Sequence, residues 1–429
     1  MVLTPHPGPH QPRQAGTHRV HDGAAYFAHE SGPLLLVLLL PILLVTYVAL
    51  EGFSVERSSP AGVANGGDGF RYEYRGVGVK RLVHDGAGHY PGDRLFLHKP
   101  DSDVIAFEPD GSTLLCCDDP GLILGETTNS RLVRLGEAAP VAAWDDTRLV
   151  LDDASHMAVS DEATVWLSGP GLASLSDDGW TVHHQTGGYG ALAVGLEGST
   201  WTDAGGTRLR ILQLRDGVRR IHASGQGLPA AAKSWAPAVT GIAVTPDGDV
   251  WVGVSGQRPR QTGGLLRYDG ERWAIARPLG KGVDVRVEGL TVAPDGMLWA
   301  YLSRDARTKE TNQAKRPVRT LLASYDGEDW TVLRESDGVP RQGARTRGDT
   351  PNVLMAAGPN GALWMTPVAH DGCRELVLFR EGEATRPLDT AACVEELELD
   401  AHGTAWAAVE WSRSRGADAW RTEIFLIDA

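Results

Sequence analysis

Short runs of alternating apolar and polar residues, separated by tight turns, recur along most of the chain. The clearest copy lies at residues 241–278 and reads GIAVTPDGDVWVGVSGQRPRQTGGLLRYDGERWAIARP. Period-two alternation predicts half-buried strands, and the Pro-Asp-Gly and Asp-Gly segments predict tight turns between them. The copy therefore predicts four short antiparallel strands joined in order, which is the plan of one blade of a β-propeller.

The same pattern returns with one aromatic position in common. Tryptophan stands on the second predicted strand of six copies, at Trp166, Trp201, Trp251, Trp299, Trp364 and Trp406. A weaker copy begins at Val104 and has Leu115 near that position. Repeats of this spacing are typical of propellers. We therefore expect an all-β fold, a seven-bladed β-propeller, in which the tryptophans pack between blades rather than bind a ligand.

The two ends of the repeat region predict how the ring closes. The last copy supplies three strands, around Leu397, Trp406 and Ile424, and then the chain ends. The segment 77–84 reads VGVKRLVH and resembles the outer strand of a blade. We expect this segment to supply the missing strand of the last blade.

A long apolar run precedes the repeats. Residues 33–50 read PLLLVLLLPILLVTYVAL without a charge, which predicts one N-terminal transmembrane helix over residues 33–53. The residues just after the run offer no good small-residue cleavage site, so an uncleaved signal-anchor is favoured over a cleaved signal peptide. Arg13 and Arg19 precede the run. The positive-inside rule then predicts a single-pass protein of the cell membrane, with a cytoplasmic N-terminus and an extracytoplasmic propeller.

The predicted domain organisation follows from these segments. Residues 1–32 are rich in proline and histidine and predict a disordered cytoplasmic tail. Residues 33–53 are the predicted anchor, residues 54–69 a flexible linker, and residues 70–429 the propeller.

The repeat resembles a known family. An alternating strand, an Asp-Gly turn and a Trp-bearing strand, followed by GGLLRYDGERW in the clearest copy, resemble the two-component regulator propeller repeat. The resemblance covers roughly residues 100–429 and implies a ligand-binding sensor domain. A weaker similarity links the repeats to streptogramin-lyase-like propellers, but no catalytic His/Glu cluster can be mapped onto this chain. The histidine kinase or DNA-binding domain that often accompanies the sensor repeat is not found in this sequence.

Long predicted loops carry basic side chains although the chain as a whole is acidic. The formal net charge is −14, which argues against nucleic acid as a partner. The candidate ligand-binding residues on these loops are Arg258, Arg260, Arg304, Arg316, Arg345 and Trp235. A basic rim would suit an anionic ligand or an unidentified protein partner. Ordinary solvated loop charges are the alternative interpretation.

The remaining predictions concern one cysteine pair and the chemistry of the chain. Cys373 and Cys393 are a possible disulfide if the domain faces an oxidising compartment, and two buried free thiols are the alternative. We expect no catalytic residue, no metal ligand and no cofactor, because the sequence contains none of the familiar motifs for such chemistry. The function predicted is a membrane-anchored, extracytoplasmic, non-catalytic propeller that acts as a ligand-binding sensor or a protein-interaction module. The alternative is a propeller enzyme, a lyase or hydrolase, with a site at the mouth of the central channel.

Overall fold

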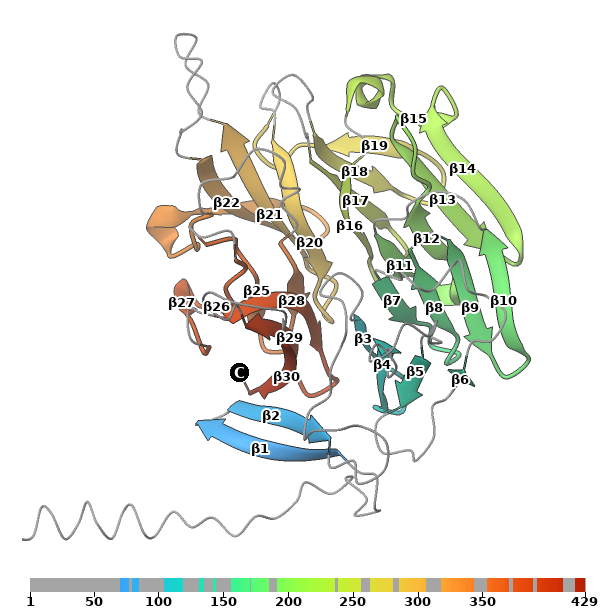
Figure 1. The fold of residues 1–429 in the computed structure, drawn as a ribbon. Coiled ribbons are helices and arrows are strands. Elements are labelled where there is room, and N and C mark those ends of the chain that lie inside the picture. Colours follow the sequence, from blue (N-terminus) through green and yellow to red (C-terminus); the bar gives the residue numbers. More distant parts are fainter. Residues whose placement is uncertain are drawn as a thin grey trace, which may run out of the picture. The chain divides into compact units, whose positions relative to one another are not determined.

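The structure is a computed structural model of the full chain (Figure 1). It describes residues 70–76, 79–84, 104–118, 131–134, 142–143, 156–169, 171–184, 191–235, 238–255, 263–280, 285–305, 318–342, 353–369, 373–388, 392–411 and 421–428. The described residues form β-strands joined by turns and three short 3-10 segments, which are η1 (Leu196–Gly198), η2 (Ala230–Ser234) and η3 (Glu335–Asp337).

The strands form successive antiparallel sheets, and most sheets keep the order of the chain. The first contains β3 (Val104–Phe107), β4 (Thr113–Asp118), β5 (Arg131–Arg134) and β6 (Ala142–Ala143). The second contains β7 (His156–Val159), β8 (Val165–Ser168), β9 (Leu172–Ser176) and β10 (Gly179–His184). The third contains β11 (Leu192–Val194), β12 (Thr200–Asp203), β13 (Arg210–Arg215), β14 (Val218–Ser224) and β15 (Gly227–Leu228), the last of which pairs in parallel.

The remaining sheets continue this plan. One contains β16 (Val239–Val244), β17 (Val250–Val254), β18 (Gly264–Tyr268) and β19 (Trp273–Ala276). The next contains β20 (Arg286–Val292), β21 (Leu298–Asp305), β22 (Val318–Tyr325) and β23 (Trp330–Arg334). It is followed by β24 (Met355–Ala357), β25 (Leu363–Met365), β26 (Val377–Arg380) and β27 (Glu383–Thr385). The last contains β28 (Ala392–Leu399), β29 (Ala405–Trp411), β30 (Arg421–Ile427), β2 (Val79–His84) and β1 (Phe70–Gly76).

The first strand of each sheet lies on the inside of a ring. In chain order these strands are β3, β7, β11, β16, β20, β24 and β28. Each contacts the next, and β28 contacts β3, so the sheets are arranged around an axis as in a propeller (Figure 1).

The prediction of seven like blades needs correction. The Trp-centred blade is repeated six times, in the sheets from β7 to β30, so the propeller has six blades of the predicted kind. The sheet of β3 to β6 departs from this pattern, since Leu115 takes the tryptophan position opposite Ile105 and Val133. Its outer strand is only two residues long. Without the large aromatic side chain and with a very short edge strand, this sheet is not equivalent to the other blades.

Membrane attachment is a separate part of the predicted fold class. Among the residues that the structure describes, no helix combines the length and the apolar character needed to cross a membrane. The predicted transmembrane helix at residues 33–53, the tail at 1–32 and the linker at 54–69 lie outside the described residues.

The last blade is closed by a strand from the other end of the repeat region. β2 pairs antiparallel with β30, with Val79 opposite Ile427 and Arg81 opposite Phe425. This is the closure that the segment 77–84 predicted. The strand β1 was not predicted; it pairs with β2 and becomes the outer edge of a five-stranded sheet.

Aromatic side chains pack one blade against the next. The Trp251 ring on β17 lies 5.4 Å from the Tyr325 ring and 5.9 Å from the Trp330 ring of the following blade, measured between ring centres. Trp201 makes the corresponding contacts with Tyr268 and Trp273, at 5.5 and 6.1 Å. The tryptophans of the second strands are buried, except for Trp299, which is half-buried. They therefore act as core residues, as their positions predicted.

Close approach of neighbouring blades also requires a residue without a side chain. A Cβ atom on Gly289 of β20 would lie 2.2 Å from the carbonyl oxygen of Val353. The backbone of Val353 donates to the Glu288 carbonyl at 2.7 Å, so two blades meet here through their main chains. Glycine at this position permits that contact.

Candidate ligand-binding site

Most of the basic residues expected to bind a ligand fall in loops that the structure does not describe. Arg258, Arg260, Arg316 and Arg345 lie outside the described residues. Arg304 lies at the end of β21 opposite Arg319 of β22, and only its backbone is described. These positions therefore remain predictions.

Trp235, the remaining candidate, is part of a hydrophobic cluster. It is 9% exposed and packs with Val239, Val254 and other core residues. A Cβ atom on Gly264 would lie 2.5 Å from the Cη2 atom of Trp235, so the indole occupies the space that this glycine leaves. Trp235, in the segment between η2 and β16, thus packs against the start of β18.

A pocket of about 590 Å³ lies between the blade of β16–β19 and the blade of β20–β23. Its lining residues are Pro278, Leu279, Arg319, Thr320, Leu321, Val332, Arg334, Glu335 and Ser336. Pro278 and Leu279 come from the turn after β19, which the bond from the Gly280 amide to the Arg277 carbonyl closes at 3.0 Å. The remaining residues come from β22, β23 and η3. The volume is in the usual range for small-molecule sites.

Strand alternation explains why two arginines and two aliphatic residues share this pocket. Leu321 of β22 is paired with Arg334 of β23, so their side chains are on the same face of the sheet. Arg319 and Val332 are two residues before them on their strands and therefore point to the same side. Leu321 and Val332 pack with Leu279 in one hydrophobic cluster, which forms an apolar floor.

The two guanidinium groups of the pocket are available to a ligand. Arg319 and Arg334 are exposed, and no ion pair joins either of them to an acidic side chain in the part of the chain that is described. They are diagonal neighbours on adjacent strands, a separation of roughly 7–8 Å between Cα atoms. An anion between two like charges at this distance would relieve their repulsion.

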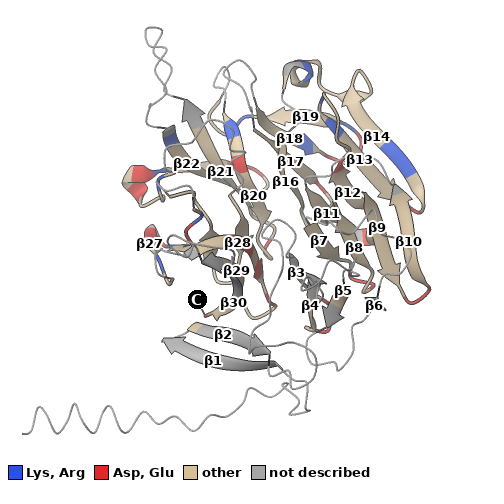
Figure 2. Ribbon diagram, viewed as in Figure 1, with Lys and Arg blue, Asp and Glu red and all other residues tan. Residues whose placement is uncertain are grey.

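The acidic residue on the rim is already engaged. The Glu335 carboxylate accepts the Thr320 amide at 3.2 Å and lies 4.0 Å from the Arg341 guanidinium. The Thr320 hydroxyl accepts the amide of Gln342 at 3.1 Å. These bonds tie η3 and the following segment to β22 and fix one wall of the pocket. Figure 2 shows acidic residues at η3 next to basic residues at the ends of β22 and β23.

Arg319 and Arg334 were not among the predicted ligand-binding residues, because those candidates were assigned to long loops and these two arginines are on strands. Both residues are at strand ends next to loops, in the segments VRTLLASY and WTVLR. Strand alternation puts Arg319 on the same face as Leu321, and Arg334 on the same face as Val332. This arrangement within each strand can be read from the sequence. Their juxtaposition with Leu279 depends on how two blades pack, and no local pattern predicts that.

A buried carboxyl group lies elsewhere, at the end of β12. Asp203 is 8% exposed and accepts the Gly205 amide at 2.8 Å. Burial raises the pKa of Asp203 to about 6, against the smaller lowering effects of the Gly205 bond and of Arg210. A carboxyl group with such a pKa can exchange a proton near neutral pH. Burial also raises the pKa of Glu398 on β28, to about 7. The enzyme alternative remains a hypothesis.

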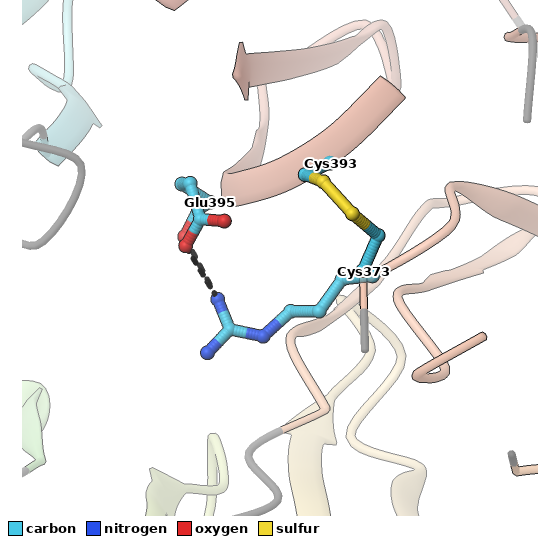
Figure 3. Close-up of a disulfide and its surroundings, with 4 residues drawn as sticks. Cys373, Cys393 and Glu395 are labelled. Carbon is cyan, nitrogen blue, oxygen red and sulfur yellow. Dashed lines mark hydrogen bonds and ion pairs between the residues drawn. A yellow bond between two sulfur atoms is a disulfide. The ribbon is translucent and has the colours of Figure 1, made fainter. Parts of the chain in front are cut away.

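The cysteine pair joins two neighbouring blades (Figure 3). Cys373, in the segment between β25 and β26, is bonded to Cys393 of β28, with Cα atoms 4.8 Å apart. The adjacent Arg374 reaches the Glu395 carboxylate at 3.1 Å, and its carbonyl accepts the Val394 amide at 2.9 Å. The disulfide and the ion pair thus fasten the closing blade to the preceding one.

Comparisons with known proteins give the fold and leave the family open. No protein-family model and no curated protein matches the chain. Solved structures do match. Hydrazine synthase of Kuenenia stuttgartiensis is 10% identical with a TM-score of 0.51, covering 75% of this chain and 96% of that one.

Two further matches are more distant in structure. A streptogramin B lyase is 15% identical with a TM-score of 0.48 and covers 78% of this chain and 96% of that one. XC5397 from Xanthomonas campestris, described as a gluconolactonase, is 13% identical with a TM-score of 0.44 and covers 87% and 99%. At such identities only the fold is shared, and the resemblance to the two-component regulator propeller repeat stays a prediction. What the order and contacts of the sheets establish is an all-β propeller.

Proposed function

We propose that the protein is a non-catalytic binding module whose pocket between β19 and β22–β23 holds a small organic anion with an apolar part. The observation that carries this proposal is the pair Arg319 and Arg334, two exposed cations without acidic partners among the described residues, above the aliphatic floor of Leu279, Leu321 and Val332. A carboxylate or phosphate group would bind the guanidinium groups through charge-assisted hydrogen bonds. An attached hydrocarbon part would cover the apolar floor.

The two arginines of the pocket contrast with the negative net charge of the whole protein. The chain carries a formal net charge of −14, which on average disfavours the approach of anions. The local pair Arg319 and Arg334 would give an anion a favourable place to bind. This supports the prediction of an anionic ligand, although the arginines involved differ from those that the sequence suggested.

The disulfide supports the proposed location outside the cytoplasm. Disulfides persist in oxidising compartments and are rare in the cytosol. The Cys373–Cys393 bond therefore fits an extracytoplasmic propeller, in keeping with the predicted orientation of the chain. A binding module in this location would act as a sensor or as part of an assembly.

Calorimetric titration with matched probes tests the proposal. Hexanoate and hexyl phosphate carry the predicted combination of anionic head and apolar tail, and hexanamide is the neutral control. We expect both anions to bind the wild-type protein and hexanamide to bind at least about 10-fold more weakly, because its head lacks the charge. Affinity for the anions should fall with rising salt concentration.

Variants assign the binding to this pocket. Arg319→Gln and Arg334→Gln should each weaken hexanoate binding by about 10-fold, since each removes a charged hydrogen-bond donor. Arg380→Gln, which changes an exposed arginine of β26 in the next blade, is the matched control and should leave binding unchanged. Equal binding of hexanoate and hexanamide, or equal affinities of the two pocket variants and the wild type, would refute the proposal.

A further inference from the structure

The outer edge of β14 is an exposed strand edge with an unusual set of side chains. β14 is paired with β13 on one side, while on the other side β15 pairs only with Ala223 and Ser224. Residues 218–222 therefore have no strand beside them among the described residues. In Figure 1 this strand lies on the outer rim of the propeller.

The backbone of this edge is available for hydrogen bonding. The Ala223 amide donates to the Gln226 carbonyl at 3.1 Å, and the Gln226 amide donates to the Ala223 carbonyl at 2.8 Å. Ala223 thus directs both its groups away from β13. Because these directions alternate along an antiparallel pair, Arg219 and Ile221 also direct their amide and carbonyl groups outward. Their outward groups have no backbone partner within the described part of the chain.

The side chains of this edge combine exposed apolar and positive groups. Val218 is 68% exposed and Ile221 is 38% exposed, and they are the two large hydrophobic residues that stand out as exposed in the described part of the chain. Between them, Arg219 and Arg220 are exposed and have no acidic partner among the described residues. Arg219 donates one bond to the His183 carbonyl of the preceding blade at 3.3 Å. Figure 2 shows this basic stretch on β14.

We propose that the β14 edge binds an extended segment of another protein by adding it as a further strand, and that this segment carries two adjacent acidic residues between two aliphatic ones. Such β-augmentation obtains affinity from main-chain bonds and specificity from side-chain pairs. The sequence Val218-Arg219-Arg220-Ile221 reads apolar, basic, basic, apolar in either direction. The complementary segment, apolar, acidic, acidic, apolar, is therefore the same for parallel and antiparallel addition. Opposite charges placed directly across two strands stabilise the pair, and so do apolar residues.

The two arginines of β14 also favour an acidic segment over a second copy of this chain as the binding partner. A second copy of this chain, paired through its own β14, would place arginine against arginine and is disfavoured. An acidic segment would neutralise Arg219 and Arg220 while covering Val218 and Ile221. This surface is separate from the pocket, so it does not depend on the proposed anion site.

Fluorescence polarisation with synthetic peptides tests this inference. The probe is a labelled, N-acetylated peptide Thr-Val-Glu-Glu-Val-Thr, and its matched controls have Gln-Gln or Lys-Lys in place of Glu-Glu. We expect the acidic peptide to bind the wild-type protein at least about 10-fold more tightly than the glutamine peptide. Methylation of the peptide's backbone amides that face β14 should abolish binding, because the added strand could no longer donate to the edge.

A double variant that reverses the charge of the β14 edge gives the decisive test. The double variant Arg219→Glu/Arg220→Glu should no longer bind the acidic peptide and should bind the lysine peptide instead. Arg319→Gln, a pocket variant, should bind the acidic peptide as the wild type does. Failure of the wild type to prefer the acidic peptide, failure of the swap, or equal binding of the methylated peptide would overturn the inference.

Discussion

The guanidinium carbon of Arg267 lies 5.5 Å from the centre of the Trp251 ring. The same guanidinium donates to the Asp249 carboxylate at 2.5 Å and to the Tyr325 hydroxyl of the next blade at 3.3 Å. Arg267 therefore joins the tryptophan of one blade to a tyrosine of its neighbour. Burial raises the pKa of Asp249, against the lowering effect of Arg267, so the carboxylate relies on this partner.

Replacing Arg267 should destabilise the propeller. Arg267→Met leaves Asp249 partly buried without its cation and removes the contact with two rings, which we expect to lower the free energy of unfolding by about 2–3 kcal/mol. Urea denaturation measures the change. Arg272→Met is the control, because its ion pair with Asp269 is exposed to solvent and should contribute little to stability. Equal effects of the two variants would contradict the role given to Arg267.

The buried carboxyl group of Asp203 should make stability depend on pH. Its pKa is about 6 in the folded protein against 3.8 for an unperturbed aspartate, so the folded state holds the proton more tightly. This contribution is fully present below pH 4 and is lost as pH rises through 6, with an upper limit of about 3 kcal/mol. Asp203→Asn keeps the acceptor for the Gly205 amide and should be more stable than the wild type at pH 7.

The measurement for Asp203 is the free energy of unfolding in urea between pH 4 and 8. The difference between the Asn variant and the wild type should grow across pH 4 to 6 and then level off. A difference that does not change with pH would show that Asp203 has an ordinary pKa.

The disulfide should stabilise the folded protein. The bond between Cys373 and Cys393 closes a loop with a sequence separation of 20 residues, for which the loop-entropy model gives about 3 kcal/mol. A dithiol reductant should lower the free energy of unfolding of the wild type by roughly this amount. The variant Cys373→Ser/Cys393→Ser should show the lower value from the start and should not respond to the reductant. This prediction would be contradicted if the reductant left the free energy of unfolding of the wild-type protein unchanged.

Much of the fold could be predicted because local signals repeat. Alternation and Asp-Gly turns locate strands such as β16 to β19, and Asp269 shows why the turn residues recur. Its carboxylate accepts the amides of Glu271 and Arg272 at 3.0 and 2.8 Å, which lowers its pKa. The pairing of β2 with β30 was also predictable, because the last copy lacked a strand.

Other features depend on contacts between segments far apart in the sequence. β1 joins the closing blade as a fifth strand, and nothing in its own residues specifies that partner. The β3–β6 sheet differs from the other blades because it lacks the tryptophan and has a short outer strand. Counting sequence repeats does not reveal this difference. The pocket combines Leu279 of one blade with Arg319 and Arg334 of another, so only the packing of blades brings it together.

Ring closure is the central claim, because the pocket and the β14 edge both depend on blades held in a ring. Thermal unfolding, followed by far-ultraviolet circular dichroism, should be compared for residues 62–429, 77–429 and 85–429. The first contains β1 and β2, the second keeps β2 alone, and the third lacks both. The account predicts that residues 77–429 unfold cooperatively with a modestly lower melting temperature, whereas residues 85–429 lose the cooperative transition. A cooperative transition of residues 85–429 at the melting temperature of residues 62–429 would contradict the account.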